Sequence, residues 1–173
     1  MISPSSATLP PPLDPAGPYR ICLVCLGNIC RSPMAEAVLR AELDRAGLAD
    51  AVEVDSAGTG DWHVGGRMDA RARAELADRG LDGTQHRARQ FQRSWLARRD
   101  LVLAMDASNF ADLRDLGVEP GRLRMLRSFD PSSDRDAEVP DPYYGEGASF
   151  ALALDQIEAA ARGLTAALHA ALA

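Results

Sequence analysis

The residues best suited to chemistry lie in one short segment, where five residues separate Cys25 from Arg31 and Ser32 follows directly. A cysteine thiolate is a nucleophile, and the planar guanidinium of arginine can hold two oxygens of a phosphoryl group at once. A serine hydroxyl can donate to the sulfur, which stabilises it as an attacking anion and as a leaving group. The three side chains together predict binding of a phosphate-sized oxyanion and nucleophilic attack on it.

The elements on either side of this segment would give it the required shape. Residues 19–24 are a mostly apolar run typical of a strand, and residues 33–46 have apolar side chains at helical spacing, with Ser32 as the expected N-cap. A loop between a strand and a helix N-terminus can turn backbone N–H groups inward, at the positive end of the helix dipole. That field favours the thiolate form of Cys25. Gly27 is expected to allow a positive backbone angle or a close approach.

Strands and helices alternate along the rest of the chain. The patterns predict strands over 52–56, 101–105 and 122–126, and helices over 69–79, over 107–116 and from about 148 onward. Such an alternation favours a parallel sheet that is covered by helices on both faces. Ligands of these sheets bind beyond the carboxyl ends of the strands, which is where the Cys25 segment lies.

Composition limits the class of protein. The 173 residues fit one domain, and 46% hydrophobic with 25% charged residues is average for a globular protein. A formal net charge of -6 argues against nucleic-acid binding, and no apolar run has the length of a membrane span. We therefore expect neither nucleic acid nor a membrane as a partner, and an anionic ligand must be held by a local site.

A proline-rich tail is expected before the domain. Residues 1–18 contain six prolines among small residues, which predicts a disordered tail, and residues 19–173 form the expected catalytic domain. The three cysteines, two of them in one loop, do not form the framework of a secreted protein, and no signal sequence is recognisable. These features predict a cytoplasmic protein.

The segment V-C-L-G-N-I-C-R-S-P at residues 24–33 resembles the active-site loop of the low-molecular-weight protein tyrosine phosphatases. Further matches to that family are D-S-A-G-T at 55–59, D-W-H-V-G at 61–65, H-R-A-R-Q at 86–90, M-D-A-S-N at 105–109 and D-P-Y-Y-G at 141–145. The segment R-M-L-R-S-F-D-P at 124–131 is most similar to actinobacterial members, including a secreted mycobacterial one. The resemblance implies a three-layer α/β sandwich with a central four-stranded parallel sheet and helices on both faces.

The same resemblance implies metal-independent hydrolysis of phosphotyrosine in proteins through a phosphocysteine intermediate, without a cofactor. It makes Cys25 the nucleophile, Arg31 the phosphate-binding residue and Asp141 the general acid and later the general base. Composition alone does not distinguish Asp141 from Asp130 or Asp134, since all three lie in one turn-rich segment. For such a mechanism we also predict inhibition by inorganic phosphate or vanadate, and we expect the chain to be a monomer.

The other loop residues are expected to surround the phosphate: Leu26, Gly27, Asn28, Ile29, Cys30 and Ser32. Asn28 suits an unusual backbone angle, and its amide can bond to neighbouring polar groups. The resemblance names Ser56 and His86 as these supports, although His86 by itself is typical of an ordinary surface or core histidine. Cys30 could form a disulfide with Cys25 under oxidation.

Three aromatic residues are candidates for the walls of a substrate slot, namely Trp62, Tyr143 and Tyr144. Aromatic side chains stack on a phenyl ring and keep polar groups at a wet rim. A deep slot would favour phosphotyrosine over the shorter phosphoserine.

Several other functions remain open for such a loop. Arsenate reductases of this fold use further downstream cysteines, but none follows Cys30. Protein arginine phosphatases resemble C-x-G-N-T-C-R and lack the paired tyrosines, whereas this chain has Ile29 and a tyrosine pair. A non-enzymatic phosphocarrier would not need Arg31 or Asp141, and a phosphotyrosine-binding module would be expected to lose Cys25. Tyrosine phosphatase activity is the preferred interpretation.

Overall fold

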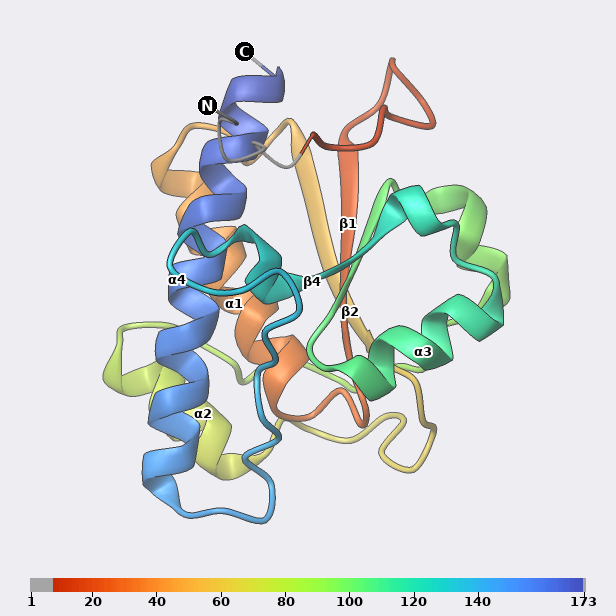
Figure 1. Cartoon of the computed structure of the whole chain (residues 1–173). Helices are drawn as coiled ribbons and strands as arrows, with labels where there is room; N and C mark the ends of the chain where they lie inside the picture. Colours follow the sequence, from red (N-terminus) through yellow and green to blue (C-terminus); the bar gives the residue numbers. More distant parts are fainter. Residues whose placement is uncertain (1–7, 173) are drawn as a thin grey trace.

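The computed structural model describes residues 8–172, and it has the expected alternation of strands and helices (Figure 1). The strands are β1 (Tyr19–Cys25), β2 (Val52–Gly58), β3 (Leu101–Ala104) and β4 (Leu123–Met125), and the helices are α1 (Arg31–Arg45), α2 (Ala70–Asp78), α3 (Ala107–Leu116) and α4 (Gly147–Leu172). Three short 3-10 helices, η1 (Arg93–Arg98), η2 (Pro120–Arg122) and η3 (Leu126–Phe129), were not predicted, because such elements have too few residues to show a period.

The four strands form one parallel sheet in the order β2-β1-β3-β4. Tyr19 on β1 pairs with Val52, Ile21 pairs with Leu101, and Val102 on β3 pairs with Leu123. The two central strands are almost completely buried, which explains why their sequences are apolar without alternation. All four strands end at the same edge, and the loop after β1 leads there directly into α1.

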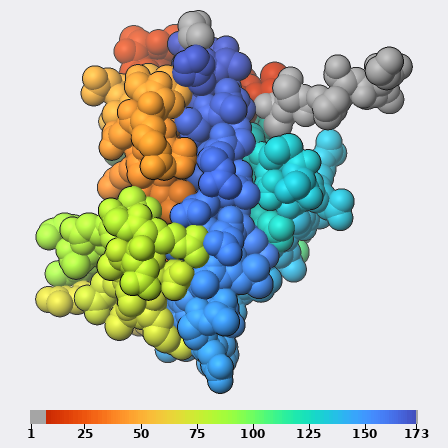
Figure 2. Space-filling view, turned by 90° about the vertical axis from the view of Figure 1, so that its left-hand side faces the viewer, coloured from red at the N-terminus to blue at the C-terminus, as the bar shows by residue number. Residues whose placement is uncertain are grey.

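Helices cover both faces of the sheet, as the three-layer prediction requires. α1, α2 and α4 form one hydrophobic cluster with side chains such as Leu23 and Ile157, and α3 packs against the other face through residues such as Val24 and Leu113. Figure 2 shows α4 as a continuous band on the first face, with α1 and α2 beside it. No helix between residues 8 and 172 is long and apolar enough to cross a membrane.

Residues 8–18 lie against the amino ends of the strands, which differs from the disordered tail expected over 1–18. The N–H of Leu13 donates to Asp100 over 2.7 Å, and the hydroxyl of Tyr19 donates to the carbonyl of Pro10 over 2.9 Å. Burial, together with Asp100, raises the pKa of Tyr19. Prolines lose little backbone freedom on ordering, so few contacts suffice to hold them. Residues 1–7 lie outside the described part of the chain.

Candidate active site

The segment between β1 and α1, residues 25–31, curls around the sulfur of Cys25, and we call it the phosphate loop. The N–H of Asn28 donates to Cys25 Sγ over 3.3 Å, and Ser32 Oγ lies 2.9 Å from the same sulfur. Only 3% of Cys25 is exposed, and all three cysteines are free. The sulfur therefore lies where the sequence predicts it, at the end of a central strand and beside a helix N-terminus.

The predicted helix cap at Ser32 is wrong. α1 already begins at Arg31, and its N-cap residue is Cys30, which forms no side-chain cap. Because Ser32 is inside the first helical turn, its hydroxyl faces the loop, where it accepts from Asn28 Nδ2 over 2.8 Å and contacts Cys25. The same hydroxyl also lies 3.3 Å from the carbonyl oxygen of Ala57, so its proton can be donated to that oxygen or to the sulfur.

Asn28 holds the curl of the phosphate loop. It is fully buried and has φ 57°, in the left-handed region that asparagine tolerates better than most residues. Its Nδ2 donates to Ser56 Oγ over 2.9 Å as well as to Ser32, and its Oδ1 accepts from the N–H of Arg89 over 2.9 Å. Every hydrogen-bonding group of the side-chain amide thus has a partner in the surrounding structure.

His86 contacts the backbone of the same loop. Its Nε2 lies 2.7 Å from the carbonyl oxygen of Asn28, which can only accept, so Nε2 carries the hydrogen. Burial lowers the pKa of His86, which favours the neutral ring. Ser56 and His86 therefore both contact the residue that the family resemblance assigned them to support.

Two glycines let the backbone pack closely around the loop. Gly27 lacks the positive φ that the sequence analysis allowed for it, and instead makes room for His63, whose Cδ2 would be 2.9 Å from an added Cβ. Gly58, which received no role, ends β2 against the loop, and a Cβ there would lie 2.7 Å from the carbonyl oxygen of Leu26. Its only signal in the sequence is its place in the D-S-A-G-T match.

Arg31 is almost completely buried behind the nucleophile, with 2% of it exposed. Its Nη1 donates to Asp106 Oδ2 over 2.6 Å and to the carbonyl of Val139 over 3.0 Å. Burial acts to lower the pKa of Arg31, but the negative groups of Cys25, Asp106 and Asp141 outweigh it and raise that pKa. The guanidinium is therefore a fixed positive charge next to the sulfur.

Asp106, which lies inside the M-D-A-S-N match, also received no role from the sequence. It caps α3 by accepting from the N–H of Asn109 over 2.8 Å, while its other oxygen holds Arg31. A signal was present, because Asp106 follows β3, the strand next to β1, and the carboxyl ends of neighbouring parallel strands meet.

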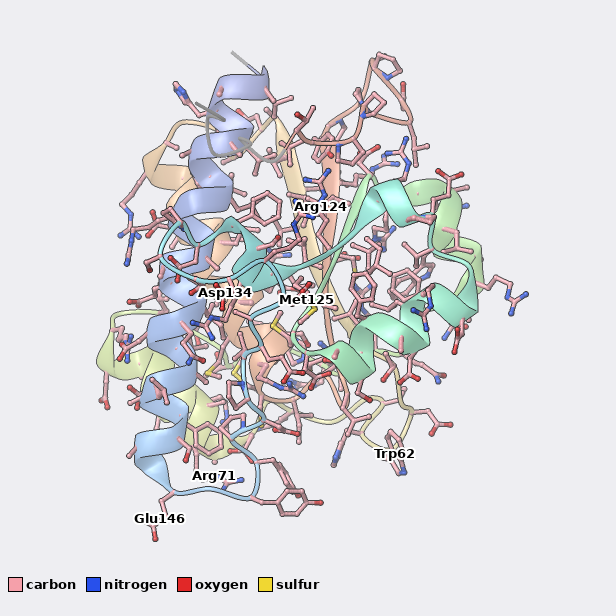
Figure 3. The ribbon with its side chains drawn as sticks, in the orientation of Figure 1. Trp62, Arg71, Arg124, Met125, Asp134 and Glu146 are labelled. Carbon is pink, nitrogen blue, oxygen red and sulfur yellow. The ribbon has the colours of Figure 1, made fainter. Side chains whose placement is uncertain are left out.

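The structure separates the three candidate aspartates. Asp141 lies 3.5 Å from Nη2 of Arg31, at the start of residues 141–146, which we call the acid loop. Asp130 instead accepts hydrogen bonds from Ser132 and Ser133 within its own turn. Asp134 is exposed, and Figure 3 shows it well separated from Trp62. The structure thus brings only Asp141 of the three to the phosphate loop.

A pocket of about 430 Å³ opens above the sulfur. The residues around it are Cys25, Leu26, Gly27, Ile29, Cys30, Arg31, Trp62, His63, Asp141, Tyr143 and Tyr144. The rings of Tyr143 and Tyr144 meet edge to face at 4.9 Å, while Trp62 and Tyr144 are 71% and 93% exposed, so the expected aromatic residues lie at the mouth. His63 also lines this pocket, although the sequence analysis gave it no role. A larger pocket of about 770 Å³ along the outer edge of β2 has no cysteine, serine or threonine among the residues that line it.

Residues 20–173 match the family model "Low molecular weight phosphotyrosine protein phosphatase". The chain belongs to this family. It is 53% identical over 155 residues to the low molecular weight protein-tyrosine-phosphatase of Streptomyces coelicolor, which covers 87% of this chain and 94% of that protein. It is 50% identical over 148 residues to low molecular weight protein-tyrosine phosphatase A of Mycobacterium tuberculosis, covering 85% and 90% of the two chains. These relatives confirm the resemblance to actinobacterial members of the low-molecular-weight phosphatases.

Solved structures of low-molecular-weight phosphatases share the fold. A protein tyrosine phosphatase from Entamoeba histolytica superposes with a TM-score of 0.83 at 33% identity, over 90% of this chain and 99% of that one. The YwlE arginine phosphatase superposes with a TM-score of 0.78 at 28% identity, over 87% and 95%. The chain is a phosphatase with this fold, and since the fold serves two kinds of substrate, side chains at the pocket must decide between them.

Proposed function

We propose that this phosphatase hydrolyses phosphotyrosine in proteins through a phosphocysteine intermediate on Cys25. One observation carries the proposal: the sulfur, with Ser32 Oγ at 2.9 Å, shares a pocket with a buried guanidinium and with Asp141, 3.5 Å from that guanidinium. A nucleophile, an oxyanion-binding group and a proton donor are the parts that an in-line phosphoryl transfer needs.

In the first step, the thiolate of Cys25 attacks phosphorus while the bond from phosphorus to the tyrosyl oxygen breaks. Arg31 and the inward N–H groups of the phosphate loop bind the non-bridging oxygens, where charge is spread in the transition state. Asp141, in its acid form, gives its proton to the departing phenolate oxygen. The products of this step are a tyrosine side chain, a phosphocysteine and an ionised Asp141.

In the second step, the carboxylate of Asp141 takes a proton from a water molecule, which attacks the phosphocysteine. The bond between phosphorus and sulfur breaks, and inorganic phosphate leaves. Ser32 stabilises the returning thiolate because its hydroxyl lies at hydrogen-bond distance from the sulfur. The site returns to its starting state. The nucleophile, the group that donates and accepts the proton and the groups that bind the phosphate all belong to the chain, so the proposal includes no cofactor or metal.

The mouth of the pocket supports tyrosine as the substrate residue. Trp62, Tyr143 and Tyr144 give aromatic surfaces above the sulfur, against which a phenyl ring can stack. Ile29 and the pair of Tyr143 and Tyr144 differ from the pattern of the arginine phosphatases, and an arsenate reductase would need a cysteine after Cys30, which the sequence lacks. The phosphocarrier and binding-module alternatives leave the carboxyl of Asp141 without a function.

The decisive experiment combines turnover with trapping. We expect repeated turnover of phosphotyrosine peptides, inhibition by inorganic phosphate and vanadate, and phosphorus on Cys25 when reactions of Asp141→Asn are quenched and analysed by mass spectrometry. Cys25→Ser should be inactive. Phosphotyrosine, phosphoserine and phosphoarginine peptides of equal sequence should be compared. One equivalent of product per enzyme would indicate a carrier, and a higher kcat/KM for phosphoarginine would replace the proposed substrate.

Two broader expectations belong to the same proposal. The few cysteines, free and buried in the structure, support a protein of the reducing cytoplasm. The chain is proposed to act as a monomer, which size-exclusion chromatography with light scattering would test at working concentrations.

A further inference from the structure

Arg71 lies in the first turn of α2, and Asp69 holds one edge of its guanidinium. Nε and Nη2 of Arg71 donate to the two carboxylate oxygens of Asp69 over 3.1 and 2.9 Å. Asp69 is also the N-cap of α2, and its backbone N–H donates to the carbonyl of Ile29 over 2.8 Å. Because Ile29 belongs to the phosphate loop, this bidentate pair is attached directly to the segment that carries the nucleophile.

The other end of the same guanidinium contacts the acid loop. Nη1 of Arg71 donates to the carbonyl of Gly145 over 3.3 Å, and its central carbon lies 5.5 Å from the centre of the Tyr143 ring. It also lies 4.6 Å from the ring of Phe150, which is 1% exposed and fixed in the first part of α4. Figure 3 shows Arg71 beside the loop that leads into the lower end of α4, across the site from Trp62. One planar cation thus bridges the two loops of the active site.

The acid loop has few other attachments. Its internal bonds, from Tyr143 N–H to Asp141 and from Gly145 N–H to Pro142, shape a turn without anchoring it. Within residues 8–172, and apart from the junction with α4, the side chains that contact polar atoms of this loop are Arg31 and Arg71. A bound phosphoryl group competes for the Arg31 donor that Asp141 now approaches, so Arg71 becomes the remaining polar anchor when substrate is present.

We propose that Arg71 is a positioning residue that keeps Asp141 in place for proton transfer to the leaving group. The inference rests on the proposed function, because it needs Asp141 to act as the general acid. Proton transfer requires a donor within hydrogen-bond reach of the leaving oxygen, and a shift of about 1 Å can cost about 100-fold in rate. Lysine cannot replace Arg71, since a single ammonium cannot hold both oxygens of Asp69 and also reach Gly145.

The test compares substrates that differ in their need for an acid. 4-Nitrophenyl phosphate has a good leaving group, while phenyl phosphate has a poor one, and kcat/KM reports the steps through leaving-group expulsion. For Arg71→Ala and Arg71→Lys we expect kcat/KM on phenyl phosphate to fall about 10- to 30-fold, and on 4-nitrophenyl phosphate less than about 3-fold.

Arg79, at the C-terminal end of α2, provides a matched control. It follows the last residue of α2 and pairs with Glu75, Asp155 and Glu158, so it also joins α2 to α4, but it has no contact with the acid loop. Arg79→Ala should match wild type within about 2-fold on both substrates, whatever its effect on the melting temperature. A loss that follows stability alone would appear in both arginine variants.

A double variant gives the second readout. In an Asp141→Asn background the acid is already absent, so Arg71→Ala should lower kcat/KM on phenyl phosphate by less than about 3-fold. An equal loss on both substrates, or the full 10-fold loss in the Asp141→Asn background, would overturn the positioning role. If wild type itself fails to turn over either substrate, the proposed function fails, and that result is distinct from a failure of the role of Arg71.

Discussion

Replacing Asn28 tests whether one side chain holds the phosphate loop in its curl. Asn28→Ala removes three hydrogen bonds, two from Nδ2 to Ser32 and Ser56 and one from the N–H of Arg89 to Oδ1, at a site without solvent exposure. At about 1 kcal/mol for each bond, the loss is about 3 kcal/mol. Alanine at φ 57° adds about 1 kcal/mol of backbone strain. We expect unfolding to become easier by about 4 kcal/mol, a large part of a typical domain stability.

Two control variants separate the contributions. Asn28→Gly loses the hydrogen bonds but accepts the left-handed backbone, so it should be less destabilised than Asn28→Ala. Ser56→Ala removes one of the bonds and should cost about 1 kcal/mol. Urea unfolding measures the free energies of unfolding, and kcat/KM of the folded variants measures the effect on the phosphate loop. When the N–H groups of the loop are no longer aligned, kcat/KM should fall at least about 10-fold. If Asn28→Ala unfolded within 1 kcal/mol of wild type and kept full kcat/KM, the network would not be what holds the loop.

Three further substitutions probe the surroundings of the loop. Asp106→Asn keeps the cap of α3 but removes the negative charge next to Arg31, so kcat/KM should fall about 10-fold. Asp106→Ala also removes the cap, so its free energy of unfolding in urea should be lower by about 1 kcal/mol more. Equal stability of the two variants would argue against the cap. Gly58→Ala places a Cβ 2.7 Å from the carbonyl oxygen of Leu26, so it should lower kcat/KM and reduce the free energy of unfolding by about 1–3 kcal/mol. In the control Gly121→Ala the added Cβ meets no atom within 4 Å, and neither quantity should change. Burial lowers the pKa of His86 in the folded protein, so as the pH falls through about 6.5 the unfolded chain takes up the proton first, and stability present at pH 7 is lost toward pH 5. His86→Gln should therefore flatten that part of the curve of unfolding free energy against pH. An unchanged slope would contradict the assignment.

The local elements of this protein could be predicted from the amino-acid sequence alone. Short apolar runs located the four strands, and the helical period of apolar residues located the four helices, since burial of such an element needs only apolar residues at the right spacing along a short segment. The nucleophile, the phosphate-binding arginine and Ser32 were identified from one eight-residue segment for the same reason, because a strand, a turn and a helix N-terminus bring them together without distant contacts. The exact start of α1 was not determined, because the curl of the loop carries Arg31 and Ser32 into the first turn.

Which distant residues join that segment depends on how the strands and helices pack. The hydrogen bonds of Arg31 to Asp106 and to Val139 span 75 and 108 positions of the chain, and they exist because β3 lies next to β1 in the sheet. No composition or period distinguishes Asp141 from other aspartates of its segment, whereas its distance to Arg31 does. The bridge from Arg71 to the acid loop depends in the same way on α2 and α4 packing side by side. Local sequence sets the conformation of each short segment, but the order of strands and the packing of helices set which segments meet, and those depend on the burial of the whole core.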